Sequence, residues 1–485
     1  MTAARVRWLG FAGSVCCAAD AVLFGAPTWI RRGVSVASIL RGPDGVLIML
    51  LWIAGLAALC AAWWLGRRLD VTSGWIRATA ALWVVPLLAV PPLASRDMYA
   101  YACQGSLFDA GLNPSVDPLS ALPCPWIESV SVVWRDTPTP YGPVWIMLAG
   151  LAASFGSQAV ALGIFRVYEV LALLGLALVL PALARRTGVS AERALWLVLC
   201  CPLVLVHLIA GGHNDTLAML LLVAGLVLVL GRSWRPVLAG GVLLGAAVLV
   251  KATLGVVLPF AALLAAGGFR ALFPGRGGVD RGALRRGVDR GALGRGVDRG
   301  ALGRVAAVTG GAVAALVGLS LASGLGFGWL TALSGAGESR SWTSPPTAAG
   351  IAVNAVGKWF GASIDVVPAA RNVAFVLLAV ALVTIWWRFR DGDALYGAGL
   401  ALLAVIFLAP ITQPWYLFWI VVLWAVAPAG PPRWFLITVV AVMFLILPNG
   451  DGAWKPLQVP LAFAVTGLAG WLAWRSVRWL REPVP

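Results

Sequence analysis

Apolar runs of membrane-spanning length recur from one end of the chain to the other. An α-helix needs about 17–25 predominantly apolar residues to cross a hydrocarbon core about 30 Å thick. Runs that meet or approach this length cover roughly residues 8–25, 46–65, 76–93, 158–183, 194–210, 214–231, 236–250, 253–268, 305–323, 368–388, 394–410, 414–430, 434–448 and 457–475. The pattern predicts an all-α polytopic membrane protein of about 14 transmembrane helices, with both termini on the same side. The segments 236–250 and 253–268 are short, and one kinked pair is the alternative there.

The composition agrees with insertion along the whole chain. Of 485 residues, 60% are hydrophobic and 12% are charged, whereas a soluble domain averages about 25% charged residues. The formal net charge of +16 would suit a nucleic-acid partner, but the arginines lie in short links between apolar segments. Cytoplasmic links carry such an excess of Lys and Arg. The charge therefore indicates membrane topology, and we expect no nucleic-acid partner.

The distribution of basic residues predicts the orientation. With the N-terminus inside, the cytoplasmic links hold 25 Lys and Arg, the outer links hold ten, and Arg166 falls within a helix. The outer links are longer than the cytoplasmic links, so link length alone would place more of the basic residues outside. Arg31, Arg32 and Arg41 on the outer side run against it. We expect a multi-pass protein of the plasma membrane, within which residues 1–485 form a single transmembrane domain.

Two links are much longer than the others. The link 270–304, cytoplasmic in this topology, contains GVDRGALRR, GVDRGALGR and GVDRGALGR at 278–304. Three copies of nine residues cannot build a solenoid, so we expect a disordered loop without a catalytic role. The link 94–157 lies outside and is rich in acidic, proline and aromatic residues. Such long links are usually functional. Its apolar part, 143–156, is too short to span and is predicted to be an interfacial or re-entrant helix.

The cysteines divide into two groups. Five of the seven lie in apolar segments, where a cysteine packs as a small hydrophobic residue. Cys103 and Cys124 instead share the long outer link. A disulfide between them would suit an oxidising compartment, and packing of Cys103 on its own helix is the alternative.

Ser95-Arg96-Asp97 directly follows the third apolar segment, at the outer interface. A lipid-phosphate donor would keep its isoprenoid chain in the bilayer and its sugar phosphate at this level. A carboxylate held there can take the proton from an incoming sugar hydroxyl, and an arginine can bind phosphate through two parallel hydrogen bonds. Asp97 is therefore a candidate general base and Arg96 a candidate phosphate ligand; helix capping or snorkelling is the alternative.

Gly211-Gly212-His213-Asn214-Asp215 and Lys251 are predicted to face the same compartment. His213, Asn214 and Asp215 are candidates for binding the donor, although Asn and Asp are also favoured helix caps. Lys251 separates two apolar runs. An ionisable residue in such a place is a functional candidate, here as a phosphate-binding charge, with snorkelling as the alternative. A single His-x-Asp is no metal signature, so no metal or cofactor is predicted.

The remaining outer links supply further candidates. Tyr141, Arg340, Gln413 and Tyr416 complete a ring of substrate-binding candidates around the outer face, although aromatic residues at interfaces are often only anchors. Asp391-Gly392-Asp393 resembles the metal-binding D-x-D of nucleotide-sugar transferases, but it lies in a tight inner link with no room for a nucleotide-binding domain. We interpret it as a solvated turn.

Several segments together resemble a known family. These are SRDMYAYACQG at 95–105, GLNPSVDP at 111–118, TPTPYGPVW at 137–145, GGHNDTLAMLLLVAGL at 211–226 and VKATLGVVLP at 250–259. They resemble the actinobacterial polyprenol-phosphomannose-dependent α-(1→6)-mannosyltransferases, integral membrane enzymes of the GT-C class. The likeness extends in order from about residue 80 to residue 430, and the repeat at 278–304 departs from it.

The resemblance implies an extracytoplasmic active site with Asp97 as the catalytic base. It also implies a polyprenyl-phosphate-mannose donor, inversion to an α-linkage, and a mannan acceptor of the lipomannan or lipoarabinomannan type. Another sugar on the same lipid carrier remains an alternative. So does a lipid-linked sugar flippase or transporter, but a transporter would place broken polar helices near the bilayer midplane and often carries inverted repeats. Neither feature is found in the sequence, which favours the transferase.

Overall fold

The computed structural model describes residues 1–24, 34–272, 298–333, 340–454 and 457–479. Within these ranges the protein is all-helical, and the only β-type pairing is one isolated bridge between Ile446 and Gly452. The expectation of an all-α fold is therefore confirmed for the described part of the chain.

The longer helices are α1 (Ala3–Phe24), α3 (Gly45–Gly66), α4 (Ser73–Val84), α5 (Asp97–Asp109), α7 (Pro143–Ala153), α8 (Gln158–Thr187), α9 (Ala191–Leu199), α10 (Asp215–Val229), α11 (Trp234–Val250), α12 (Leu258–Ala266), α15 (Arg299–Ala322), α17 (Pro345–Trp359), α18 (Val367–Phe389), α19 (Ala394–Leu408), α20 (Leu417–Val426), α21 (Arg433–Val442) and α22 (Gln458–Trp479). Short helices are α2 (Val36–Leu40), α6 (Val132–Arg135), α13 (Phe269–Leu272) and α16 (Gly328–Ala332). The 3-10 and π-helical segments that matter below are η2 (Val85–Leu87), η5 (Val204–Ala210), η6 (Ala252–Val257) and η9 (Pro414–Tyr416).

Each predicted apolar segment coincides with helical structure, but fewer helices have full spanning length. Among the described residues, five helices are long and apolar enough to cross a membrane, namely α1, α3, α8, α15 and α18. A sixth candidate is the pair α9 and η5, which is bent by 60°. Eight further apolar helices have 10–17 residues. The chain is therefore a membrane protein, and the count of about 14 crossings is not confirmed.

The bend between α9 and η5 has a covalent cause and lies at the centre of the molecule. Pro202 follows α9, and a proline lacks the N–H that a continuous helix needs and clashes with the preceding turn. The chain resumes as η5, a π-helical segment whose seven residues are all buried. Every residue of α20 is buried as well. The core therefore lies where η5 and α20 meet α8, α9 and α10.

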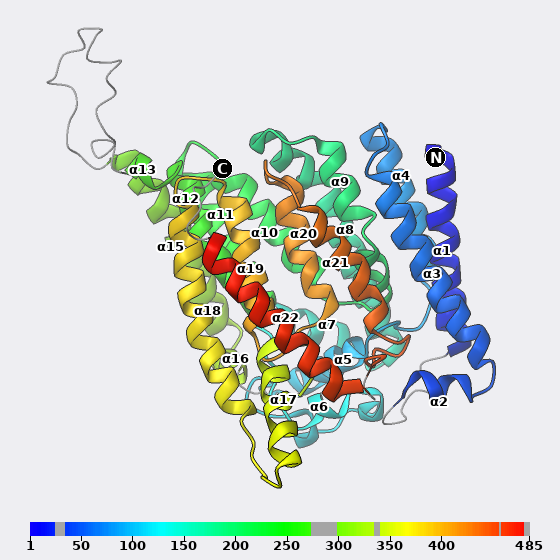
Figure 1. Cartoon of the computed structure of the whole chain (residues 1–485). Coiled ribbons are helices and arrows are strands. Elements are labelled where there is room, and N and C mark those ends of the chain that lie inside the picture. Colours follow the sequence, from blue (N-terminus) through cyan, green and yellow to red (C-terminus); the bar gives the residue numbers. More distant parts are fainter. Residues whose placement is uncertain (25–33, 273–297, 334–339, 455–456, 480–485) are drawn as a thin grey trace, which may run out of the picture.

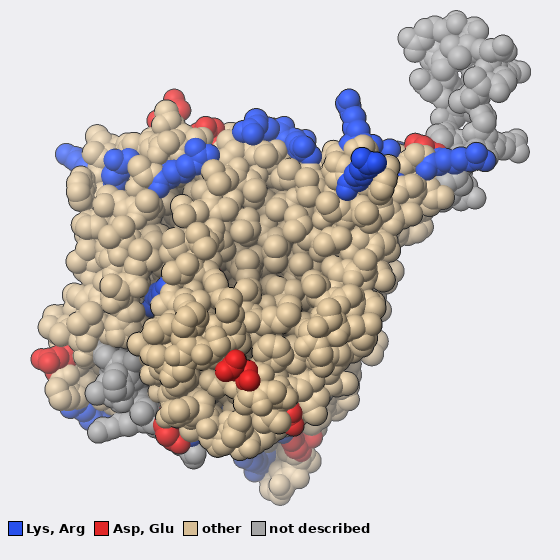
Figure 2. Space-filling view, turned by 180° about the vertical axis from the view of Figure 1, so that it is seen from behind, with Lys and Arg blue, Asp and Glu red and all other residues tan. Residues whose placement is uncertain are grey.

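Charged residues are distributed unevenly over the surface. Figure 2 shows Lys and Arg gathered mainly along one end of the molecule, with a broad uncharged belt below them. This basic end is the end at which α1, α4 and α9 begin, whereas α5, α7 and α17 lie toward the opposite end (Figure 1). The two ends therefore differ in charge as the distribution along the sequence predicts.

Three segments within the predicted links are helical. The 94–157 link begins with α5, whose residues from Met98 to Gly105 are all buried, so this helix belongs to the core of the fold. The later link contains α17, which packs on α22 (Figure 1). Part of the expected repeat loop is also helical, because Arg299–Arg304 form the start of α15. The rest of the repeat, up to residue 297, lies outside the described residues.

Candidate active site

A cavity of about 230 Å³ brings together residues from both halves of the chain. It lies between the start of α5, the segment before α7, the break between α11 and η6, and the segment that joins α19 to η9. Five predicted site residues line it: Asp97, Tyr141, Lys251, Gln413 and Tyr416. The other lining residues are Trp134, Pro140, Ala252, Thr253, Leu333, Phe375, Val405, Ile406, Ala409, Pro410, Ile411, Trp415 and Trp419.

Asp97 is held at the cavity by a strained and anchored backbone. Ala94 has φ 58°, in the left-handed region that non-glycine residues seldom adopt. Its N–H donates to the Pro448 carbonyl at 2.6 Å, and the N–H of Leu93 donates to the Ala210 carbonyl at 3.1 Å. The Asp97 N–H donates to Ser95 Oγ at 3.0 Å. Strain of this kind persists where surrounding contacts impose it, often at functional sites. Here it places Asp97 at the first position of α5.

Arg166 ties the same backbone to the π-helical segment. Its buried guanidinium donates to the carbonyls of Leu87 at 3.2 Å, Val90 at 3.0 Å and Ile209. Leu87 and Val90 precede Asp97, and Ile209 lies in η5. Sequence reasoning placed this arginine in a helix and gave it no role. Its only signal was a lone charge within an apolar run, which is a functional hypothesis in itself.

His213 lies beneath Asp97 and is fully buried. Its Nδ1 is 2.6 Å from the His207 carbonyl oxygen, and its Nε2 is 3.4 Å from Asp97 Oδ2. Trp415 packs over the imidazole with 3.9 Å between ring centroids. Gly212, the residue before His213, has φ 65°, and a Cβ there would overlap with Met98 Sδ of α5. A glycine at this position therefore lets the chain pack closely against α5. His213 is therefore close to the candidate base, without lining the cavity itself.

Asp215 and Lys251 form a buried ion pair. Lys251 Nζ is 3.2 Å from Asp215 Oδ2 and 3.5 Å from Asn214 Oδ1, while Trp419 Nε1 donates to Asp215 Oδ1 at 2.6 Å. Asn214 is the N-cap residue of α10 but makes no side-chain cap hydrogen bond, whereas Asp215 lies in the first turn, where a carboxylate suits the helix dipole. The capping alternative is therefore wrong for the Asn214 side chain, while Asp215 combines its place in the first turn with the ion pair to Lys251. Snorkelling of Lys251 to water is also ruled out, because its side chain is 9% exposed.

Aromatic rings surround the Lys251 ammonium. Its Nζ lies 5.4 Å from the ring centroid of Tyr141, 5.3 Å from that of Tyr416 and 5.9 Å from that of Trp419. Faces of such rings attract cations within about 6 Å. The tyrosine before α7 comes this close because Gly142 packs on α11, where a Cβ would overlap with the Leu249 carbonyl oxygen. Lys251 thus has a fixed position on the cavity wall.

The Tyr141 hydroxyl is a neutral donor at the cavity. It lies 3.3 Å from the hydroxyl of Tyr101. Burial raises the pKa of Tyr141 well above its usual value, and the negative charge of Asp97 raises it further. The hydroxyl therefore stays protonated across the physiological range and can bind a sugar or phosphate oxygen.

The two predicted arginines, Arg96 and Arg340, do not line the cavity. Arg96 is half-buried, and desolvation lowers its pKa, while the charge of Asp451 acts in the opposite direction. Its guanidinium does not line the cavity. Arg340 forms two hydrogen bonds with Asp365, at 3.0 and 2.6 Å, on an exposed surface. Hydrogen bonds from Arg340 and Asn354 lower the pKa of Asp365 to about 2. The structure thus pairs Arg340 with a carboxylate.

Thr253 and Trp415 were missed as site residues. Both line the cavity, and the structure describes no partner for the buried Thr253 Oγ1 or the buried Trp415 Nε1. Buried polar groups normally have hydrogen-bond partners, so these two donors are available to a ligand. Thr253 lies two residues after Lys251, which is the one signal that the sequence offers. Within the described part of the chain, no group of three or more His, Cys, Asp or Glu residues has the geometry of a metal site.

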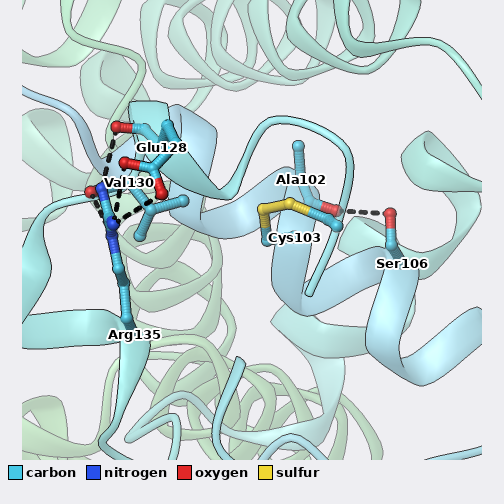
Figure 3. The surroundings of a disulfide bond; sticks show 7 residues. Ala102, Cys103, Ser106, Glu128, Val130 and Arg135 are labelled. Carbon is cyan, nitrogen blue, oxygen red and sulfur yellow. Dashed lines mark hydrogen bonds and ion pairs between the residues drawn. A yellow bond between two sulfur atoms is a disulfide. The ribbon is translucent and has the colours of Figure 1, made fainter. Parts of the chain in front are cut away.

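A disulfide fixes the segment between α5 and α7, which carries Trp134 and Tyr141. Cys103 of α5 is bonded to Cys124, with 5.4 Å between the two Cα atoms. Figure 3 shows this bond near a second tie, in which Arg135 contacts the carboxylate and carbonyl of Glu128 and the carbonyl of Val130. The predicted disulfide is therefore confirmed. It joins α5, the helix that carries Asp97, to the chain that leads to α6.

Replacing Cys124 with serine should lower the melting temperature without changing the chemistry of the site. Closing a loop of about 20 residues contributes on the order of 3 kcal/mol. The measurement is a melting curve together with a free-thiol count before and after reduction. Cys16→Ser changes a free, partly exposed cysteine and is the control. Seven free thiols in the unreduced folded protein, one for every cysteine of the chain, would contradict the prediction.

Comparison with known proteins identifies the family. Residues 7–267 match the family described as Alpha-(1->6)-mannopyranosyltransferase, N-terminal domain, and residues 346–475 match the MptB C-terminal domain. The chain is 33% identical to Alpha-(1->6)-mannopyranosyltransferase A of Mycobacterium tuberculosis, over 96% of this chain and 89% of that protein. It is 28% identical to the protein of the same name from Corynebacterium glutamicum, over 89% of each chain. No solved structure matches.

The helical membrane fold and these relatives define the chain as a membrane glycosyltransferase. It belongs to the alpha-(1->6)-mannopyranosyltransferase family and is a mannosyltransferase. The transporter alternative is therefore not supported. The predicted resemblance to this family is confirmed.

Proposed function

We propose that the protein transfers mannose from a polyprenyl-phosphate-mannose donor to an α-(1→6)-mannan of lipomannan or lipoarabinomannan type, on the outer face of the plasma membrane, within a single GT-C-like domain. The observation that carries the proposal is one cavity lined by a carboxylate, a buried ammonium and an apolar wall. These three features match the acceptor hydroxyl, the phosphate and the isoprenoid chain of the two substrates.

Asp97 is the general base of the proposed reaction. Its carboxylate lines the cavity, and 17% of its side chain is exposed, so an acceptor hydroxyl can reach it. The acceptor oxygen forms a bond to the mannose C1 while the bond from C1 to the phosphate oxygen breaks, and the phosphate keeps the electron pair. Asp97 takes the hydroxyl proton. Attack from the face opposite the leaving group inverts the configuration at C1, which converts a β-linked donor to an α-linked product.

Lys251 binds the donor phosphate, together with neutral donors on the same wall. Its ammonium is a compact charge with three N–H groups, of which one donates to Asp215 and a second, over a longer distance, to Asn214. Thr253 Oγ1 and Trp415 Nε1 supply unpaired donors next to it. A phosphate that develops charge as the bond to C1 breaks is stabilised by such preorganised donors. Arg96 and Arg340, which do not line the cavity, have no direct role in this proposal.

The apolar wall receives the start of the isoprenoid chain. It consists of Leu333, Phe375, Val405, Ile406 and Ala409, from the end of α16, from α18 and from α19 and its end. Phe375 is 49% exposed, and α18 presents most of its surface outward. A hydrocarbon chain can therefore leave the cavity along α18 into the surrounding lipid. This wall favours a lipid-linked donor over a soluble nucleotide sugar.

The charge asymmetry supports an outward-facing site. The basic end corresponds to the cytoplasmic side under the positive-inside rule. Helix α5, which carries Asp97, and helix α7, which follows Tyr141, lie toward the opposite end (Figure 1). With the predicted topology of about 14 crossings, the 94–157 segment is extracytoplasmic. An impermeant thiol reagent added to intact cells should label cysteines introduced at 110–122, but not those introduced at 299–304. The reverse pattern would contradict the orientation.

The proposed function is tested with purified protein in lipid vesicles. Incubation with polyprenyl-phosphate-mannose and a short α-(1→6)-mannoside should extend the acceptor by one α-linked mannose, whereas GDP-mannose should give no product. A parallel incubation with polyprenyl-phosphate-glucose or polyprenyl-phosphate-arabinose examines the alternative that another sugar is carried. Faster transfer of either sugar would overturn the assignment of mannose, and a β-linked product would overturn the inverting mechanism.

A further inference from the structure

We infer that His213 shares with Asp97 the proton that is taken from the acceptor hydroxyl; this inference rests on the proposed function. His213 does not line the cavity and has no exposed side-chain surface. It acts on the reaction only through Asp97, so it is a positioning residue. The contacts on its two ring nitrogens specify this role.

The first contact determines which nitrogen carries the proton in the neutral ring. His213 Nδ1 lies 2.6 Å from the His207 carbonyl oxygen. A carbonyl oxygen only accepts hydrogen bonds, so Nδ1 must be the donor. A neutral imidazole protonated on Nδ1 has its lone pair on Nε2. The π-helical geometry of η5 and the closely packed Gly211 bring the His207 carbonyl to this position.

The second contact directs that lone pair at the candidate base. His213 Nε2 is buried, the structure describes no hydrogen bond to it, and Asp97 Oδ2 lies 3.4 Å away. The distance is slightly longer than an ordinary hydrogen bond. Catalytic hydrogen bonds are often long in the absence of substrate and tighten during reaction. One proton can therefore lie between Asp97 Oδ2 and His213 Nε2, because both atoms can accept a hydrogen bond.

The proton transfer balances without any added reactant. As the acceptor oxygen bonds to C1, its proton moves to Asp97 Oδ2, and the leaving phosphate carries away the electron pair of the broken bond. The Asp97 O–H then faces His213 Nε2 and can pass the proton on, which gives an imidazolium beside a carboxylate. The Nδ1–H bond to His207 is kept throughout. After product release the proton returns to solvent through Asp97, the exposed member of the pair.

The surroundings favour a proton on this pair. Trp415 covers the imidazole at 3.9 Å, and the face of an indole ring stabilises a cation. A second acceptor atom 3.4 Å from Asp97 Oδ2 gives the transferred proton a second position within the pair. The other ionisable groups around the pair are Tyr101, Tyr141, His207, Asp215, Lys251 and Tyr416.

The kinetic test uses His213→Gln, in which an amide replaces the basic ring. We expect kcat to fall by about 10–100-fold, with the KM for the donor changed less than about twofold, because no donor contact is lost. The acid limb of the pH–rate profile should move to lower pH, because Asp97 alone then binds the proton. His207→Phe keeps the main-chain carbonyl and removes the other imidazole, and its acid limb should stay where it is in the unmodified protein. Equal loss at every pH in His213→Gln, with an unmoved acid limb, would overturn the inference.

A second measurement does not depend on transfer activity. The chain has only two histidines, so in the His207→Phe protein all histidine ¹⁵N signals come from His213. Solid-state NMR in lipid vesicles should show a neutral ring protonated on Nδ1, and ring protonation should require lower pH when Asp97→Asn is added. A neutral ring protonated on Nε2, or a titration that ignores Asp97→Asn, would overturn the inference. An unmodified protein that fails to transfer mannose overturns the proposed function instead.

Discussion

Asp97→Asn should almost abolish mannosyl transfer while the protein stays folded and binds its donor. The amide has the size of the carboxylate but cannot take a proton, and losing a general base typically costs about 10²–10⁴-fold in rate. The substitution leaves the local fold intact, because the anchoring bonds are donated by the main-chain N–H groups of Leu93, Ala94 and Asp97. The measurement is kcat and the donor KM, with a melting curve to check folding.

A matched control lies at the other end of the same helix. Asp109 ends α5 and is exposed, and it does not line the cavity. Asp109→Asn should therefore retain full activity. Asp215 is the only rival for the role of base among the predicted residues, but its two oxygens are occupied by Lys251 and Trp419. An active Asp97→Asn protein combined with an inactive, folded Asp215→Asn protein would show that the base was wrongly assigned.

The helices could be predicted because the membrane imposes a simple pattern on the sequence. Apolar length alone located α3, α8, α15 and α18 within a few residues of most of their observed ends. The same criterion overlooked α5, because its sequence mixes Asp, Tyr, Gln and Ser with apolar residues. Most of α5 is surrounded by protein on all sides. A helix in such a place has no single apolar face, so the spacing of its apolar residues does not reveal it.

The composition of the site was partly predictable, whereas its pairings were not. Charged residues at helix ends on one face singled out Asp97 and Lys251, and both line the cavity. Local sequence offered Asp215 as a donor-binding candidate with helix capping as the alternative, but its partner Lys251 is 36 residues away. Arg96 was chosen because a guanidinium can bind phosphate, and Arg340 because it lies in a predicted outer link. The structure pairs Arg340 with Asp365, which no spacing rule connects to it, and Arg96 does not line the cavity.

Lys251→Met should weaken both folding and donor binding, and a second substitution separates the two effects. Removing the ammonium leaves the fully buried Asp215 carboxylate without its counter-charge. Breaking a buried ion pair in this way typically costs about 3–5 kcal/mol. The single variant should therefore melt at a much lower temperature, and loss of its activity alone would not distinguish phosphate binding from folding.

The double variant Lys251→Met, Asp215→Asn removes both charges and keeps an acceptor for Trp419. The amide oxygen of the introduced side chain can still accept the Trp419 N–H that Asp215 Oδ1 accepts at 2.6 Å. Replacing a complete buried ion pair by neutral groups is often neutral or stabilising, so the melting temperature should largely recover.

Donor affinity should not recover in the double variant, because a hydrogen bond to a charged group contributes about 1.5–3 kcal/mol. The donor KM should remain roughly 10–100-fold above that of the unmodified protein, as this loss of binding free energy implies. Melting curves and donor titrations of the single and double variants provide the comparison. If the double variant regains the original donor KM together with its stability, Lys251 serves only to neutralise Asp215, and the phosphate must be bound by Thr253, Trp415 and Tyr141 alone.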